Sequence, residues 1–236
     1  MRPRRGLFFD LDDTLKLSTP GNVEMLIALA REAGVAVGAD NVLEAHRFAY
    51  RYWSDREQVT RDLGALSLDD FWSAYIARQL VVMGADGSAG DLQALAGAIN
   101  RRFAAEYKPV AVLAPGADAL LRQLSDAGLI LGLVSNRERP LAATTHELGI
   151  LHHFDFTLAA GEVGAWKPET AIFTRALDLA GVSDAARAVY VGDNYWTDIL
   201  GAQEAGLGAI LVDRWGLFPE ARARFPVVRS LEELLA

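Results

Sequence analysis

Residues 7–14 read Leu7-Phe8-Phe9-Asp10-Leu11-Asp12-Asp13-Thr14, a short apolar run that gives way to acidic and hydroxyl side chains. Four later apolar runs, bounded by polar residues or glycine, lie at 130–134, 154–158, 188–191 and 209–212. Runs of this length and composition are typical of buried parallel strands. Between them lie amphipathic stretches, at about 116–127, 138–148, 169–180 and 196–205. This alternation predicts an α/β fold built on a doubly wound parallel sheet.

One long segment, residues 17–108, breaks the alternation. Apolar residues recur there at helical spacing in four stretches, 23–33, 42–56, 68–83 and 92–107, and no strand is expected between them. The segment is predicted to be an inserted helical domain, with 1–16 and 109–236 forming the core. Gly116, which follows Pro115, marks the return to the α/β pattern.

Composition excludes several classes of function. The 236 residues carry a net charge of -8, the wrong sign for a general nucleic-acid binder, and contain no cysteine for disulfides or thiolate chemistry. The start, residues 1–5, is basic, but the apolar run after it is too short for an export signal. No stretch approaches the roughly 18 apolar residues of a membrane span. We expect a cytoplasmic protein without nucleic-acid or membrane partners; no pattern indicates an oligomeric state.

Polar side chains follow three of the predicted strands at the point where each strand ends. These are Asp10, Ser135 and Asp193. Ligands of open α/β sheets bind at the carboxyl ends of the strands, so the three groups should converge on one edge. A helical insertion leaving from that edge would cover them as a lid.

The acidic turn after the first run suits acid–base and nucleophilic chemistry. Asp10 at a strand end can act as a covalent nucleophile, and Asp12 can reach a leaving-group oxygen as general acid and base. Thr14 can help to fix the turn. The alternative is an ordinary acidic turn, which is common in proteins of this charge.

Two later positions suit phosphate binding. Ser135 and its backbone neighbours can bind phosphate oxygens, although Ser135 and Asn136 could equally cap the next helix. Lys167, one of only three lysines beside 20 arginines, stands between the third strand and its helix. Its compact ammonium suits a place between a carboxylate and a phosphoryl group, although a lone lysine is usually a surface charge.

The stretch 192–198 carries a second pair of aspartates. Asp193 and Asp198 can complete an oxygen-ligand cation site with Asp10, and carboxylates crowded in this way repel one another without a cation. The alternative is a turn into a helix that Asn194 or Thr197 caps.

The ordered set of motifs resembles the haloacid dehalogenase-like (HAD) hydrolase superfamily, in its phosphatase branch with a helical C1-type cap, over essentially the whole chain. The resemblance implies a Rossmann-like core, Asp10 as nucleophile and Asp12 as acid and base. It implies Mg²⁺ as the cofactor, held by Asp10, Asp193, Asp198 and the backbone carbonyl of Asp12. It places Ser135 and Lys167 at the phosphate, with Thr14 and Asn136 beside them.

The function that the resemblance implies is hydrolysis of a small phosphorylated metabolite through an aspartyl-phosphate intermediate. Asp12 must be protonated in the first half of this reaction, so we expect its pKa to be shifted accordingly. Asp12 argues against a dehalogenase, and the lack of lysine between 17 and 107 argues against a phosphonatase. A phosphomutase remains open. A catalytically silent binding module would be expected to lack Asp10 or Asp12.

The inserted segment contains the candidates for substrate contacts, namely Trp53, Arg56, Arg61 and Trp72, whose alternative is a solvated surface. The i, i+4 pairs Phe48 with Tyr52 and Phe71 with Tyr75 are expected in the core of the insertion. The four histidines, His46, His146, His152 and His153, lack metalloprotease spacing and are expected to be structural or surface residues.

Overall fold

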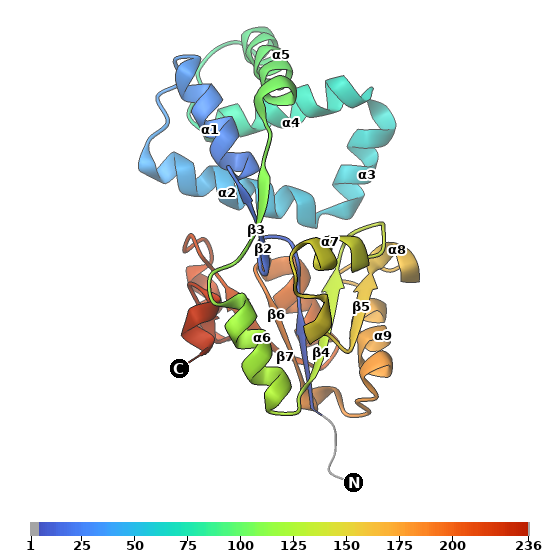
Figure 1. Cartoon of the computed structure of the whole chain (residues 1–236). Coiled ribbons are helices and arrows are strands. Elements are labelled where there is room, and N and C mark those ends of the chain that lie inside the picture. Colours follow the sequence, from blue (N-terminus) through green and yellow to red (C-terminus); the bar gives the residue numbers. More distant parts are fainter. Residues whose placement is uncertain (1–4, 236) are drawn as a thin grey trace. The chain divides into compact units, whose positions relative to one another are not determined.

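The computed structural model describes residues 5–235, and the chain divides into two compact units (Figure 1). The α/β unit contains the described residues up to Leu17 and from Ala111 onward. The helical unit is Ser18–Val110. The sequence analysis sets the corresponding boundaries after residues 16 and 108. The first four residues of the basic start, on which the export argument rests, lie outside the described residues.

The α/β unit is built on a six-stranded sheet in the order β5-β4-β1-β6-β7-β8, with every pair parallel. The five apolar runs are confirmed as strands. The two-residue β8 at the edge was not predicted, because it is too short to show a pattern. The bounds are β1 Gly6–Phe9, β4 Ile130–Ser135, β5 Phe156–Ala159, β6 Ala188–Gly192, β7 Gly208–Val212 and β8 Val227–Val228.

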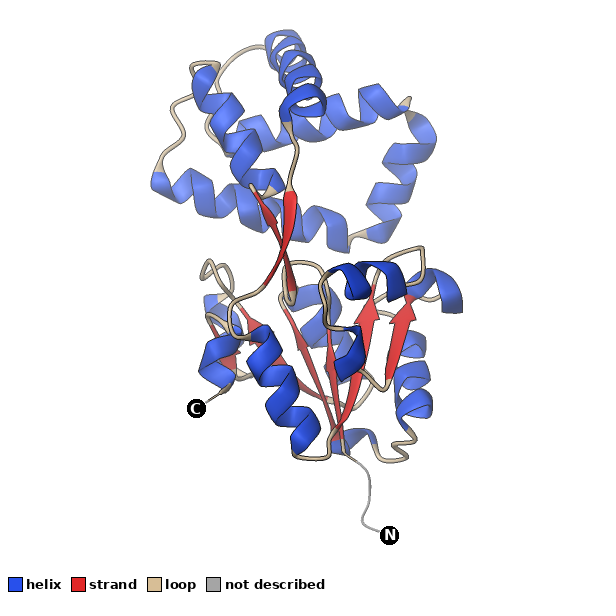
Figure 2. Cartoon of the chain, viewed as in Figure 1, coloured by secondary structure: helices blue, strands red, loops and turns tan. Residues whose placement is uncertain are grey.

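Helices lie on both faces of this sheet (Figure 2). Because side chains alternate along a strand, Phe9 of β1 packs with the leucines of α6, whereas Phe8 points to the other face. Tyr190 and Phe173 of α9 meet edge to face, with ring centroids 5.2 Å apart. The helices are α6 Ala117–Asp126, α7 Ala142–Glu147, α8 Ala160–Val163, α9 Thr170–Ala180 and α10 Gly201–Glu204.

Two helices of this unit differ from the expected ranges. α7 begins only at Ala142, because Pro140 disfavours helical geometry in the residue before it. The stretch expected at 196–205 is a π-helical turn, Tyr195–Leu200, that runs into α10.

The helical unit consists of five helices, α1 Asn22–Glu32, α2 Ala39–Ser54, α3 Arg56–Ala65, α4 Leu68–Val82 and α5 Ala89–Glu106. Four of them were predicted. α3 was missed because none of its residues is buried, so it has no apolar stripe. The side chains of Ser67 and Ser88 cap α4 and α5.

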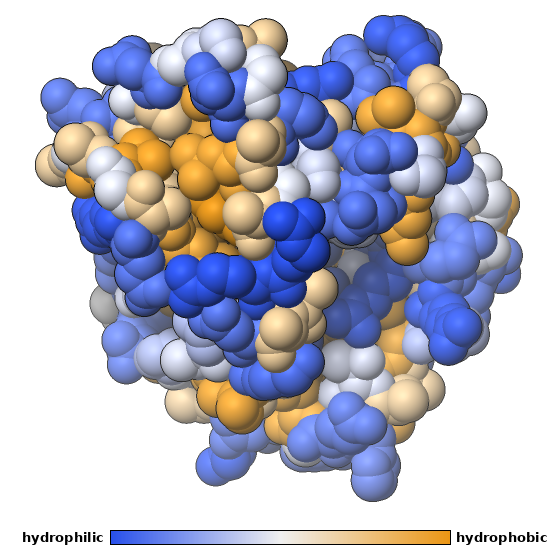
Figure 3. Space-filling model, turned by 90° about the horizontal axis from the view of Figure 1, so that it is seen from above, coloured by the Kyte–Doolittle hydropathy of each residue, from blue (hydrophilic) through white to orange (hydrophobic). Residues whose placement is uncertain are grey.

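The core of the helical unit includes Tyr52, Phe71 and Tyr75, with Phe48 packed against it, as their spacing predicted. Apolar residues also remain on its surface, among them Leu63, Leu66, Leu68 and Val81. On the face shown in Figure 3, apolar side chains gather in patches bordered by hydrophilic ones.

Both connections between the units run through a two-stranded sheet of β2 Lys16–Thr19 and β3 Val110–Leu113. These strands were not predicted, because they are short, contain no fully buried residue and carry no alternation of apolar and polar residues. Among residues 5–235, no helix combines the length and the apolar character needed to cross a bilayer.

The central strands should dominate the stability of the α/β unit. Leu133 of β4 is fully buried, so Leu133→Ala should lower the free energy of unfolding by about 2–5 kcal/mol. Leu179 on α9 is 40% exposed, so Leu179→Ala provides the control and should change it by less than about 1 kcal/mol. Urea denaturation followed by circular dichroism measures both; equal losses would contradict this account of the core.

Candidate active site

Three carboxylates meet at the carboxyl ends of the central strands. Asp10 directly follows β1, Asp193 directly follows β6, and the π-helical turn brings Asp198 back towards them. All three are buried, and one carboxylate oxygen from each lies within 4.8 Å of the others. The neighbouring places of β1 and β6 in the sheet bring Asp10 and Asp193 together, as expected from the sequence.

Backbone hydrogen bonds hold two of these aspartates in place. The amide of Asp10 donates to the carbonyl of Val191 at 2.9 Å, and Asp198 Oδ2 accepts the amide of Asn194 at 3.0 Å. The Asn194 side chain accepts the amides of Trp196 and Thr197. The capping expected for Asn194 is therefore present, and it accompanies the carboxylate cluster rather than replacing it.

Lys167 is the buried cation of this cluster, with only 4% of its surface exposed. Its Nζ lies 2.5 Å from Asp10 Oδ1, 2.7 Å from Asp198 Oδ1 and 2.8 Å from the Tyr190 hydroxyl. Burial by itself would lower the pKa of Lys167, but the charges of Asp10 and Asp198 hold it well above its usual value. Lys167 is therefore a buried, charged group and not a surface lysine.

Tyr190 is a member of the site that the sequence did not reveal. Its hydroxyl donates to the carbonyl of Val134 at 2.7 Å, so the oxygen is left to accept a hydrogen bond from Lys167. Burial raises the pKa of this phenol well above its usual value and keeps it neutral. From the sequence, Tyr190 is simply one of the large residues of a buried strand.

Asn136 differs from its expected role at the phosphate. Its Nδ2 donates to the backbone carbonyl of Lys167 at 2.9 Å, and its Oδ1 accepts the backbone amide of Lys167 at 2.7 Å. The side chain thus holds the Lys167 backbone from both sides. Ser135 ends β4 and is buried. The alternative in which these two residues cap the next helix is wrong, because α7 begins six residues later.

Asp12 forms ion pairs that the sequence did not predict. Arg137 Nε and Nη2 donate to its two carboxylate oxygens at 2.7 and 2.8 Å, and Lys16 Nζ donates at 3.0 Å. Burial alone would raise the pKa of Asp12, but the hydrogen bond from Arg137 and the charges of Lys16 and Arg137 lower it. The expected shift towards the protonated form is therefore wrong for this arrangement, because two cations stabilise the carboxylate.

Thr14 and Asp13 shape the turn between these aspartates. Thr14 is fully buried, and its hydroxyl donates to Asp193 Oδ1 at 3.0 Å, so it orients a carboxylate of the cluster. Asp13 has a φ of 60°, a conformation that aspartate tolerates better than most residues. Its amide donates to the carbonyl of Lys16 at 2.7 Å and closes the turn.

The electrostatics of the cluster are those of a site with excess negative charge. Burial raises the pKa of Asp10 to about 7; the charge of Lys167 opposes this shift, and the charge of Asp198 adds to it. The three carboxylates lie beside a single ammonium, which forms ion pairs with two of them, and all the candidate ligand atoms are oxygens. Hard divalent cations such as Mg²⁺ prefer this donor set, so the residues fit such an ion.

A second group of potential ligands, Asp118 with His152 and His153, lies elsewhere in the α/β unit. His153 Nε2 is 2.9 Å from Asp118 Oδ1, and Arg122 pairs with the other oxygen of that carboxylate. These contacts join the turn Leu151–His153 to α6. His153 and His46 are buried, and His146 and His152 are exposed, as expected for structural and surface residues.

Comparisons with known proteins confirm the resemblance inferred from the motifs. The family model of the haloacid dehalogenase-like hydrolases matches residues 5–206. Phosphoserine phosphatase of Thermus thermophilus is 32% identical over 94% of each chain. Ribulose-1,5-bisphosphate 5-phosphatase of Halopiger xanaduensis is 32% identical over 88% of this chain and 84% of that protein.

The fold also matches solved structures. The crystal structure of a 2-haloacid dehalogenase from Pseudomonas syringae superimposes with a TM-score of 0.54 at 27% identity, covering 98% of this chain and 96% of that chain.

Close packing holds the segment that carries Lys167. A Cβ added at Gly201 would lie 2.8 Å from Pro168 Cα, so Gly201→Ala should lower the free energy of unfolding by about 1–3 kcal/mol. Gly97→Ala on α5 is the control: its new Cβ would meet nothing closer than 3.7 Å, and better helix propensity should add up to about 1 kcal/mol. Chemical denaturation of both variants measures the difference, and a stabilised Gly201→Ala would contradict this packing argument.

Proposed function

This chain belongs to the haloacid dehalogenase-like hydrolase family, and we propose that it is a Mg²⁺-dependent phosphatase acting on a small phosphorylated metabolite. The contact that carries the proposal is that of Asp10 with Lys167, within a cluster that also contains Asp193 and Asp198. A carboxylate nucleophile, a buried cation and further oxygen ligands are what phosphoryl transfer to an aspartate requires. The phosphatase names of the two relatives agree with it.

In the first half of the reaction, Asp10 attacks the phosphorus atom and forms an aspartyl-phosphate, while the oxygen of the departing alcohol takes a proton from Asp12. Lys167 orients Asp10 and offers positive charge to the phosphoryl oxygens, and Ser135 adds a hydroxyl at the end of β4. The ion pairs of Asp12 with Arg137 and Lys16 have to break before Asp12 can carry and donate a proton, since both cations stabilise the carboxylate.

In the second half, the Asp12 carboxylate removes a proton from water, and the resulting hydroxide attacks the phosphorus of the aspartyl-phosphate. This step needs Asp12 without its proton, the form that Arg137 and Lys16 favour. The products are inorganic phosphate and Asp10 in its starting state.

The residues that would hold Mg²⁺ are Asp10, Asp193 and Asp198, with the backbone carbonyl of Asp12. When bound, the cation supplies positive charge that stabilises the ionised nucleophile and the phosphoryl oxygens. Thr14 supports it indirectly by orienting the Asp193 carboxylate.

We also assign the helical unit, Ser18–Val110, as the cap that selects the substrate. A phosphomutase would use the same core residues, and its test is whether phosphate is released to water or moved within the substrate. Asp10 and Asp12 are both present, which disfavours a silent binding module, and Asp12 disfavours dehalogenation.

The nucleophile is tested directly by Asp10→Asn. The amide cannot form the aspartyl-phosphate, so phosphate release from p-nitrophenyl phosphate and from natural monoesters should fall by at least about a thousandfold. EDTA should abolish the activity of the unmodified protein, and added Mg²⁺ should restore it. A phosphate-release assay over a panel of esters measures each effect.

Asp13→Asn is the matched control, because it makes the same chemical change in the same turn at an exposed residue, and asparagine also tolerates a φ of 60°. Activity should be retained. Equal loss in both variants would indicate a general effect of charge in the turn, and activity that survives Asp10→Asn would refute the mechanism.

The support of the cation site is tested by Thr14→Val, which keeps the shape of the side chain and removes the hydrogen bond to Asp193. Loss of a group that orients a ligand weakens metal affinity about 10- to 100-fold. We therefore expect the Mg²⁺ concentration that gives half-maximal phosphatase activity to rise by that factor, while the rate at saturating Mg²⁺ changes less. An unchanged half-maximal Mg²⁺ concentration would show that the Thr14 hydroxyl does not support Mg²⁺ binding.

A further inference from the structure

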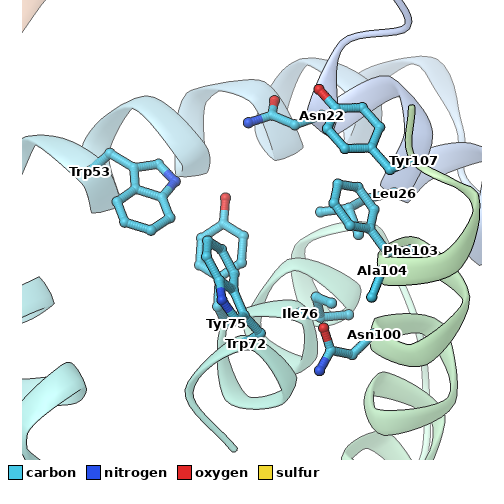
Figure 4. Close-up of a pocket in the computed structure, with 10 residues that line it drawn as sticks. All are labelled: Asn22, Leu26, Trp53, Trp72, Tyr75, Ile76, Asn100, Phe103, Ala104 and Tyr107. Carbon is cyan, nitrogen blue, oxygen red and sulfur yellow. The ribbon is translucent and has the colours of Figure 1, made fainter. Parts of the chain in front are cut away.

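The helical unit contains a cavity of about 330 Å³ whose lining is rich in aromatic side chains (Figure 4). We call it the aromatic pocket, defined by Trp53, Trp72, Tyr75, Phe103 and Tyr107, with Asn22 and Asn100 as its amides. Trp72 and Tyr75 lie on one side of the space, and Phe103 and Tyr107 lie on the other. Three aliphatic side chains complete the lining, and none of the ten lining residues is charged.

The two tryptophans of the lining are partly exposed. Trp53 and Trp72 keep 39% and 37% of their surface accessible, with their ring centroids 5.7 Å apart. Phe103 and Tyr107 stack on each other at 4.5 Å. Exposed aromatic faces that surround a cavity of this size are typical of a site for a small molecule.

Tyr75 contributes a hydrogen-bond donor to the aromatic pocket. Its hydroxyl oxygen accepts from Gln79 Nε2 at 3.0 Å and from the side chain of Trp53. A phenol oxygen has two lone pairs, and these contacts use both, so its own hydrogen is left to donate. Figure 4 shows the hydroxyl pointing into the open space beside Trp53.

The two amides add a donor and an acceptor. Asn100 Nδ2 donates to Asp69 Oδ1 at 2.8 Å; because Asp69 offers only acceptors there, the Asn100 carbonyl oxygen must be the atom left for a ligand. Asn22 Oδ1 accepts the amide of Val23 at 2.7 Å, which leaves Asn22 Nδ2 as a donor. The lining thus offers two donors and one acceptor between aromatic faces.

We propose that the aromatic pocket recognises a neutral, planar heteroaromatic ring bearing both acceptors and a donor, of the kind found in a nucleobase. The inference rests on the proposed function, because it names the organic part of the ester substrate: nucleoside monophosphates or close analogues. Stacking holds such a ring between the aromatic side chains, and its polar edge satisfies Tyr75 and Asn100.

Other occupants fit the lining less well. A carboxylate or a second phosphate would be desolvated without a cation among the lining residues. An alkyl chain would bury the Asn100 carbonyl oxygen and the hydrogen of the Tyr75 hydroxyl without partners. Arg56 and Arg61, which the sequence suggested for an anionic substrate group, are exposed and are not part of the lining.

The test compares kcat/KM for nucleoside monophosphates (UMP, CMP, AMP and GMP) with that for esters without a ring (phosphoserine, glycerol phosphate and ribulose 1,5-bisphosphate). At least one nucleotide should exceed every ring-free ester by tenfold or more. Trp72→Ala should reduce that preference about tenfold, chiefly through KM, and Trp72→Phe should restore most of it because it keeps an aromatic face.

Leu68→Ala is the control: Leu68 lies one turn earlier on the same helix, is 68% exposed and does not line the pocket, so the preference should not change. Mg²⁺-dependent hydrolysis with no preference for nucleotides would overturn this inference and leave the proposed function standing.

If no ester is hydrolysed, the proposed function fails. Calorimetric titration with uridine, cytidine, adenosine and guanosine then tests whether the pocket binds a heteroaromatic ring. Saturable binding that Trp72→Ala weakens supports ring recognition, and no binding of any nucleoside overturns it.

Discussion

The α/β unit depends on one interaction, the placement of the Lys167 ammonium among Asp10, Asp198 and Tyr190. An ammonium has three hydrogens, and each finds an oxygen at 2.5–2.8 Å. A buried lysine without these partners would lose its proton, and the crowded carboxylates without the lysine would take up protons. Each charge is therefore stable in the interior only because the others are there, and this mutual dependence fixes the geometry of the site.

Several neighbouring groups of the α/β unit hold the Lys167 ammonium in position. Asn136 holds the Lys167 backbone through two hydrogen bonds. The Tyr190 oxygen can accept from Lys167 because the Tyr190 hydroxyl donates its hydrogen bond to the Val134 carbonyl. Pro168, the next residue, leaves no room for a side chain at Gly201. None of these groups need touch a substrate, but together they leave the ammonium few alternative positions, and a preorganised charge stabilises a transition state without first having to rearrange.

The sequence predicted the parts of this arrangement that follow from strand order, and it missed those that follow from side-chain direction. Parallel strands bring their carboxyl ends to one edge, so the sequence predicts that Asp10, Ser135 and Asp193 lie together. Nothing in the local pattern says that Tyr190 turns its hydroxyl to Lys167, or that Arg137 reaches Asp12 across 125 residues of chain. Helix α3 and the β2–β3 pair were missed for a different reason: they bury too little to leave a periodic signal.

The two units divide the chemistry by polarity. The cluster around Lys167 is rich in charge, as the proposed binding of a phosphate group requires. The lining of the aromatic pocket contains no charged residue, as the proposed recognition of a neutral ring requires. Because each unit has its own hydrophobic core, a substitution in the pocket leaves the packing around Asp10 and Lys167 intact. In the function that we propose, specificity can therefore change through residues such as Trp53 and Trp72 while the charge balance around Asp10 is kept.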